Sequence, residues 1–144
     1  MILDDEAATI AAGEKLAKVV RPGDVVTLSG DLGAGKTTLV RGLLRALGHE
    51  GEVPSPSFAI IQPYEELQPP VWHADLYRLE HSSELAELGL DSLDDSVLIV
   101  EWPELAGDNA WPNALRLTLE ITGPKRRRLT ARVPAAWEKR WPPR

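Results

Sequence analysis

The stretch Gly30–Thr38 has the residue types and the spacing of a site that binds phosphate groups. Its residues, GDLGAGKTT, fit the pattern G-x-x-x-x-G-K-[ST]. Glycines lack a Cβ atom, so successive backbone N–H groups can turn inward around an anion. Lys36 would supply a positive charge to the β- and γ-phosphates of a nucleotide, and the Thr37 hydroxyl is suited to coordinate Mg²⁺. The N–H and hydroxyl groups of Thr38 are placed for the α-phosphate.

The sequence on both sides of this stretch predicts the elements that such a loop requires. Residues 24–29 are β-branched and apolar after the turn Pro22–Gly23, which is typical of a buried strand. Residues 36–47 carry leucines and a valine at helical spacing, and Gly48 follows as a stop signal. The positive end of this helix dipole would face the bound anion. A glycine-rich turn that binds nothing is the alternative, and the strand–loop–helix context argues against it.

Two further apolar stretches end in carboxylates. Residues 71–76 predict a strand in which His73 and Asp75 point to the same face. Residues 96–101 form an apolar run that ends in Glu101, as expected for a buried parallel strand with an acid at its carboxyl edge. Phosphate-loop proteins place the Mg²⁺-associated acid at the end of such a neighbouring strand. Either acid could therefore contact the metal, and we favour Glu101 because its strand is the more convincing.

The remaining pattern predicts an α/β fold with a mainly parallel sheet flanked by helices, antiparallel edge strands and a C-terminal hairpin. A first helix over residues 4–20 would be capped by Asp4 or Asp5. The other expected elements are a strand at 58–64, a short helix at 82–89 and hairpin strands at 115–122 and 128–133.

Two segments allow a functional and a structural interpretation. Residues 53–58 hold Ser55 and Ser57 next to two prolines, which suits either a rigid connector or a switch loop that presents hydroxyls to the γ-phosphate. Residues 125–128, KRRR, could contact RNA or an acidic partner. The tip of a hairpin with solvated charges is the simpler interpretation of this second segment, and we favour it.

Composition narrows the class of protein. A chain of 144 residues suggests one domain, and the net charge of −6 argues against a surface devoted to nucleic acid. The sequence has no cysteine, so it excludes disulfides and thiolate metal sites and fits a reducing cytoplasm. No apolar run approaches the ~18 residues of a membrane span, and the acidic N-terminus does not resemble a signal peptide.

Read together, four motifs resemble one family. GDLGAGKTT at 30–38, SPSF at 55–58, HADLYRL at 73–79 and EWPE at 101–104 occur in the order and spacing of the TsaE family. That family is the ATPase component of the bacterial machinery that makes threonylcarbamoyladenosine in tRNA. The resemblance extends from Thr9 to the C-terminal hairpin, and the combination of motifs is far more specific than the phosphate loop alone.

The resemblance implies ATP and Mg²⁺ as ligands and assigns roles to individual residues. Thr9 matches a threonine near the nucleotide base, although its spacing alone suggests an ordinary helix threonine. The phosphates would be held by Gly33, Ala34, Gly35, Lys36, Thr37 and Thr38. Thr37 and Glu101 would bind the metal, and Lys36, Asp75 and Glu101 would be catalytic. Trp102 matches the aromatic residue beside the acid. Ser57 replaces the threonine usual in the family, so the hydroxyl is kept and a methyl group is lost.

The implied activity is ATP hydrolysis that drives the cycle of the TsaB–TsaD heterodimer, with tRNA contacted only through that complex. Slow turnover is expected of the chain alone, because no arginine finger is evident in a mobile loop. A small-molecule kinase on the same fold is the alternative, although no arginine-bearing lid is apparent. A GTPase is disfavoured because the guanine-reading Asn-Lys-x-Asp signature is absent.

Overall fold

The computed structural model describes residues 1–53, 61–77, 94–107 and 110–142. The helices in these ranges are α1 (Glu6–Ala17) and α2 (Lys36–Ala46), together with the short 3-10 helices η1 (Pro103–Ala106) and η2 (Ala135–Trp137). The strands are β1 (Ile2–Leu3), β2 (Val25–Ser29), β3 (Ile61–Tyr64), β4 (Val71–Asp75), β5 (Val97–Glu101), β6 (Leu115–Ile121) and β7 (Arg127–Arg132). None of the helices in these ranges is both long and apolar enough to cross a membrane.

One seven-stranded sheet organises the molecule, in the order β1-β7-β6-β2-β5-β4-β3. The four central strands, β6, β2, β5 and β4, run parallel to one another. The edges are antiparallel, with β3 pairing with β4 on one side and with β7 and β1 added beyond β6 on the other. The predicted α/β fold, with a mainly parallel sheet, antiparallel edges and a C-terminal hairpin, is therefore confirmed.

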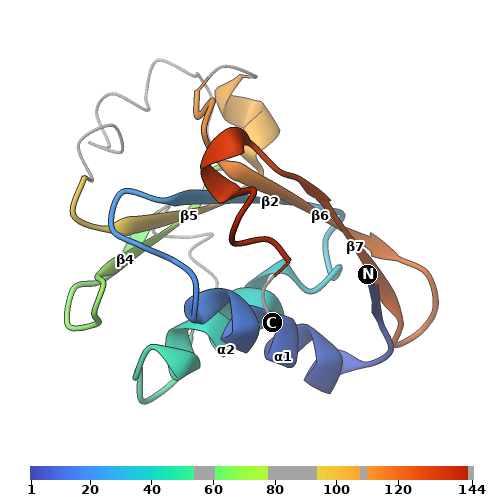
Figure 1. Cartoon of the computed structure of the whole chain (residues 1–144). Helices are drawn as coiled ribbons and strands as arrows, with labels where there is room; N and C mark the ends of the chain where they lie inside the picture. The colour runs from blue at the N-terminus through green and yellow to red at the C-terminus, as the bar shows by residue number, and fades with distance from the viewer. Residues whose placement is uncertain (54–60, 78–93, 108–109, 143–144) are drawn as a thin grey trace.

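The two long helices lie side by side under the same face of the sheet (Figure 1). Two glycines let them approach closely, because a Cβ on Gly13 would lie 2.0 Å from the Leu39 carbonyl oxygen and one on Gly42 would lie 2.2 Å from the Ile10 carbonyl oxygen. Any larger residue at either position would force the helices apart. This packing fixes α2, and with it the loop that precedes it.

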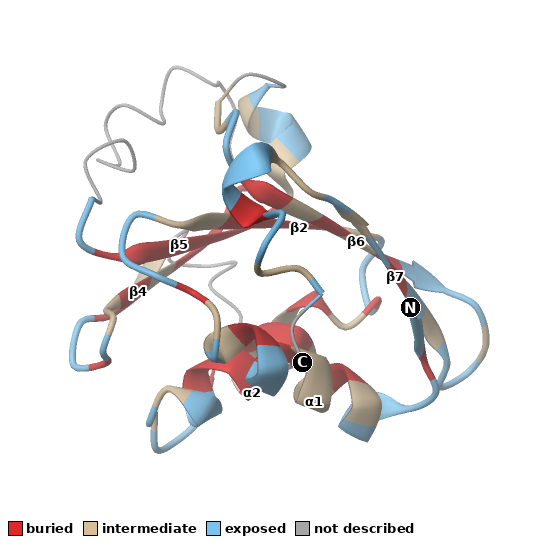
Figure 2. Ribbon diagram, viewed as in Figure 1, coloured by how far each residue is buried: buried red, intermediate tan, exposed pale blue. Residues whose placement is uncertain are grey.

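The hydrophobic core consists of two clusters, one on each face of the sheet. Strand β5 contributes to both and is buried along its whole length (Figure 2). Val97 and Ile99 pack into the cluster shared with α1 and α2, whereas Leu98 and Val100 pack into a smaller cluster on the other face. The uninterrupted apolar run of β5 is explained by this double burial. Trp137 of η2, which the sequence pattern did not mark as a core residue, is 1% exposed and packs into the larger cluster.

The predicted elements differ from the observed ones mainly at their ends. The first helix covers Glu6–Ala17 rather than 4–20, because the Asp5 side chain accepts a hydrogen bond from the Ala8 N–H at 2.8 Å and so begins it. Strand β1 was not predicted, since two residues are too few to show alternation. Two expected features, the helix at 82–89 and the segment 54–60, lie outside the described residues. So does Arg78, the arginine near the end of the strand predicted at 71–76.

Candidate nucleotide site

The loop Gly30–Thr38, called the P-loop below, connects β2 to α2 at the carboxyl end of the central strand. Its backbone uses conformations that favour glycine, with φ of 81° at Gly33 and 103° at Gly35. Gly35 is the residue before the first turn of α2, where no side chain caps the helix. The free N–H groups of this first turn are therefore available to a ligand, as expected for a helix N-terminus that binds an anion.

The two predicted acids lie at the same level of the sheet as the strand that leads into the P-loop. Leu28 pairs with Glu101 across β2 and β5, and Glu101 pairs with Asp75 across β5 and β4. Both carboxylates are buried, at 3% and 4% exposed. The Thr37 hydroxyl lies 3.2 Å from Oε2 of Glu101 and 3.5 Å from its Oε1. The fold thus brings Thr37, Glu101 and Asp75 to one end of the parallel sheet.

A buried histidine contacts the same oxygen of the Glu101 carboxylate as Thr37 does. His73 Nε2 lies 2.6 Å from Glu101 Oε2, and the His73 side chain is completely buried. Its other ring nitrogen, Nδ1, is buried and has no hydrogen-bond partner among the residues that the structure describes. The predicted alternation, which put His73 and Asp75 on the same strand face, holds in the structure. The sequence pattern marks His73 as a polar residue on the same face as Asp75, but it does not show that His73 contacts Glu101.

Asp75 has a different environment from Glu101. Its Oδ1 accepts a hydrogen bond from the Tyr77 N–H at 2.9 Å. Burial raises the pKa of Asp75 above its ordinary value of 3.8, and the nearby charge of Glu101 raises that pKa further. The Tyr77 hydrogen bond and the charges of His73 and Lys36 act in the opposite direction. Asp75 is therefore a carboxylate with an increased affinity for a proton.

Lys36 lies across the P-loop and is 5% exposed. Its ammonium group donates to the Gly30 carbonyl oxygen and lies 3.5 Å from that of Asp31. The same nitrogen is 3.9 Å from the centre of the Trp102 ring, close enough for a cation–π contact. Burial lowers the pKa of Lys36, and four surrounding carboxylates oppose this shift. The Lys36 ammonium is thus held by loop carbonyls and by the face of an aromatic ring. A bound phosphate could take the place of these contacts.

Arg127, the first residue of β7, contacts the P-loop from the other side. Its Nε donates to the Ala34 carbonyl oxygen at 3.1 Å, and its Nη2 donates to that of Gly33 at 3.2 Å. The expectation of a solvated hairpin tip is therefore wrong for Arg127, although Lys125, Arg126 and Arg128 are exposed. The sequence showed only a basic run, and nothing in it marked which arginine would reach a loop more than ninety residues away.

Two hollows border the P-loop. The first, of about 360 Å³, is lined by the loop together with Asp75, Glu101 and Trp102. The second, of about 420 Å³, is lined by loop residues, Thr9 and Arg127. Thr9 is buried, and its Cγ2 lies 3.6 Å from where a Cβ on Gly35 would be. The fold thus places Thr9 beside the loop, as the sequence resemblance implied, and its proposed proximity to the nucleotide base remains a prediction.

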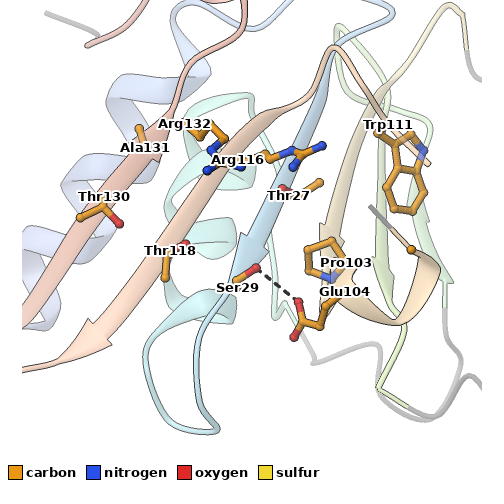
Figure 3. A pocket seen from close by; sticks show the side chains of 11 residues that line it. Thr27, Ser29, Pro103, Glu104, Trp111, Arg116, Thr118, Thr130, Ala131 and Arg132 are labelled. Carbon is orange, nitrogen blue, oxygen red and sulfur yellow. Dashed lines mark hydrogen bonds between the residues drawn. The ribbon is translucent and has the colours of Figure 1, made fainter. Parts of the chain in front are cut away.

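A third hollow, also of about 420 Å³, lies on the sheet face opposite to α1 and α2 (Figure 3). Hydroxyl and guanidinium groups of β2, β6 and β7 line it, among them Thr27, Thr118 and Arg132. At one end Ser29 donates to Glu104 at 3.4 Å. Because Asp75 and Glu101 point to the other face of the sheet, this hollow is separate from the acids and the P-loop.

The side chains around Thr37 fit a Mg²⁺ ion that arrives with a nucleotide. In the described part of the chain, no group of three or more His, Cys, Asp or Glu side chains could hold a metal by itself. Mg²⁺ is commonly bound by one or two carboxylates together with substrate phosphates and water. The Thr37 hydroxyl and the Glu101 carboxylate supply oxygen ligands at the mouth of the P-loop. A cation there would also offset the repulsion that raises the pKa of Asp75.

A glycine loop between a central parallel strand and a helix, with acids at the ends of two nearby strands, defines a P-loop protein of the α/β class. A family model described as "Threonylcarbamoyl adenosine biosynthesis protein TsaE" matches residues 3–130. The chain therefore belongs to the TsaE family.

Individual relatives agree with this assignment. A Streptomyces coelicolor protein named tRNA threonylcarbamoyladenosine biosynthesis protein TsaE is 48% identical over 112 residues, which cover 75% of this chain and 76% of that protein. A Bacillus subtilis protein of the same name is 40% identical over 124 residues, covering 85% and 77%. The crystal structure of YdiB from Bacillus subtilis superimposes with a TM-score of 0.81 at 31% identity, covering 96% of this chain and 87% of that one.

Proposed function

We propose that this chain is a Mg²⁺-dependent ATP hydrolase of tRNA threonylcarbamoyladenosine biosynthesis, acting in the cytoplasm as a single P-loop domain. The observation that carries the proposal is the meeting of Lys36, Thr37, Glu101 and Asp75 around one hollow. Hydrolysis would drive the cycle of the TsaB–TsaD heterodimer, and tRNA would be contacted through that complex. Membership of the TsaE family supports the pathway.

The contacts around Lys36 suggest how the site would receive ATP. In the structure its ammonium is held by the carbonyls of Gly30 and Asp31 and by the Trp102 ring. A phosphate oxygen is a stronger, charge-assisted partner than a neutral carbonyl. We therefore expect Lys36 to exchange these contacts for the β- and γ-phosphates, while N–H groups of Gly33–Thr38 and the Thr38 hydroxyl hold the phosphate chain.

The two acids would divide the chemistry between them. Thr37 and Glu101 would hold Mg²⁺, which when bound would neutralise charge that develops on the phosphates. His73 and Thr37 keep the Glu101 carboxylate in place through the contacts of its Oε2. Asp75, whose pKa is raised by burial, is suited to orient the attacking water and to accept its proton. A carboxylate with higher proton affinity is a better base, which is the reason for this assignment.

Turnover by the chain alone should be slow. An arginine finger typically supplies ~10³–10⁵ in rate, in cis or from a partner. Among the described residues, Arg127 is an arginine that reaches the P-loop, and it donates to backbone carbonyls and so is occupied. We therefore expect the partner complex to stimulate hydrolysis, with the segment 55–58 as the part that responds to the γ-phosphate.

The test combines binding and turnover. Calorimetry should show that Lys36→Ala weakens ATP binding by about 1–3 kcal/mol, the value of a charge-assisted contact. Phosphate release by the unaltered chain should rise at least several-fold when the TsaB–TsaD pair is added, and the affinity for the pair should differ between ATP and ADP. An unchanged ATP dissociation constant in Lys36→Ala would refute the site. A phosphorylated small-molecule product would instead support the kinase alternative.

A further inference from the structure

Arg127, in the β6–β7 hairpin, makes several hydrogen bonds to the backbone. Its guanidinium group donates to four backbone carbonyl oxygens that belong to two separate segments. Two of them, Gly33 and Ala34, are in the P-loop, at 3.2 and 3.1 Å. The other two, Gly123 and Arg126, are in the β6–β7 turn, at 3.1 and 2.9 Å from Nη1. The side chain therefore ties the hairpin to the loop.

The two P-loop contacts fix consecutive peptide planes on either side of Ala34. In a trans peptide the carbonyl and the N–H of the next residue point in opposite directions. The plane that carries the Gly33 carbonyl is also held at its other end, because the Ala34 N–H donates to the Asp31 carbonyl oxygen at 3.0 Å. The plane that carries the Ala34 carbonyl turns the Gly35 N–H away from Arg127. That N–H lies at the start of α2, where the site requires donors.

The loop needs such an external tie because its own sequence leaves it flexible. Gly33 and Gly35 flank Ala34 with φ of 81° and 103°, and glycine has more backbone freedom to lose than any other residue. Holding the loop in place before the ligand arrives lowers the entropy cost of binding. Arginine suits the task, because its planar group offers five N–H donors in a fixed fork, whereas lysine offers a single charged point.

We propose that Arg127 is a positioning residue of the nucleotide site, which holds the P-loop in its phosphate-binding conformation and couples it to the β6–β7 hairpin. This inference rests on the proposed nucleotide-binding function. The adjacent arginines differ from Arg127 in their contacts. Arg126 faces Asp4 at 3.5 Å and Arg128 faces Glu120 at 4.0 Å, with all four side chains at least half exposed. Replacing Arg126 or Arg128 by alanine removes one positive charge, as replacing Arg127 does, but it removes no contact with the P-loop.

The experiment compares Arg127→Ala and Arg127→Lys with Arg126→Ala and Arg128→Ala. In the nucleotide-free proteins, hydrogen exchange of the peptide that contains residues 30–38 should speed up in Arg127→Ala and be unchanged in both controls. The dissociation constant for MgADP should rise roughly tenfold or more in Arg127→Ala, because binding must then order a loop that Arg127 holds in place in the unaltered chain. Arg127→Lys keeps the charge without the fork, so it should lie between Arg127→Ala and the unaltered chain.

A second readout separates positioning from chemistry. With saturating ATP, kcat of Arg127→Ala should stay within a few-fold of the unaltered chain, because the loss falls on affinity. The melting temperature of each variant checks that it is folded. If Arg127→Ala does not fold, the comparison is made with Arg127→Lys instead. Unchanged exchange and affinity in the folded Arg127 variants, or equal losses in all three arginine positions, would overturn the inference. If the unaltered chain binds no nucleotide, the proposed function fails, while the exchange comparison still decides whether Arg127 holds the loop.

Discussion

The two sides of the P-loop are built in different ways. On the acidic side, the ends of β4 and β5 bring side chains to side chains, as in the contact of Glu101 with Thr37 and His73. On the basic side, the partners of Arg127 in the described part of the chain are backbone carbonyls. The acidic side therefore presents functional groups to a reaction, whereas the basic side sets the conformation of the loop. Substitutions on the acidic side should alter the rate of turnover, and substitutions on the basic side should alter the affinity for nucleotide.

The largest effect is expected at Glu101. Glu101→Gln preserves the shape and a hydrogen bond to His73 but removes the charge that would face Mg²⁺. Hydrolysis with the partner complex should fall by on the order of 10²–10⁴-fold. The ADP dissociation constant should change by no more than a few-fold, because the phosphate contacts are intact. Phosphate release and calorimetry measure the two quantities. Full turnover in the variant would remove Glu101 from the catalytic set and break the division between the two sides.

A smaller effect is expected at His73, which touches Glu101 rather than the ligand. His73→Leu removes the donor, and loss of such a supporting contact typically costs about 10–100-fold. The loss should appear in kcat and in the Mg²⁺ concentration needed for half-maximal rate, with little change in metal-free nucleotide affinity. His73→Gln can place an N–H near the same oxygen and should recover part of the rate. Equal rates for the two variants would show that packing, not the hydrogen bond, is what His73 contributes.

Asp75 shares the large loss of hydrolysis that is expected at Glu101, and its separate effect on stability is the smallest of the effects considered. Because burial raises the pKa of this carboxyl, its charged form is disfavoured in the folded protein at neutral pH. Asp75→Asn removes that charge and can still accept from the Tyr77 N–H. Its free energy of unfolding at pH 7 should increase by on the order of 1 kcal/mol, the usual scale when a destabilising functional group is replaced. Partner-stimulated hydrolysis should nevertheless be lost.

The pH dependence of this gain has a definite sign. A raised folded pKa means that Asp75 costs stability progressively as pH rises from 3.8 through its folded value. The difference between Asp75→Asn and the unaltered chain should therefore be constant above that folded value and shrink as the pH is lowered through it toward 3.8. Denaturant unfolding in the absence of nucleotide at a series of pH values checks it. A difference that grows on acidification would show that Asp75 is stabilised as an anion.

The sequence by itself determined the parts of this protein that depend on local pattern. The glycines and Lys36 had to lie between a strand and a helix, because apolar spacing on both sides predicts those elements. Asp75 and Glu101 were expected at strand ends, and parallel strands bring such ends to one edge of a sheet. The order of the motifs was also sufficient for the family resemblance that the comparisons confirm.

Only the tertiary structure decided which of the remaining polar residues belong to the site. His73 contacts Glu101 because β4 and β5 are neighbours in a particular register, and alternation within one strand does not specify the neighbour. Arg127 was indistinguishable from Arg126 and Arg128 in the sequence, since all three carry the same charge. One of them reaches the P-loop because the pairing of β7 with β6 turns its side chain toward Gly33 and Ala34. Contacts between distant segments depend on packing and register, which no local pattern encodes.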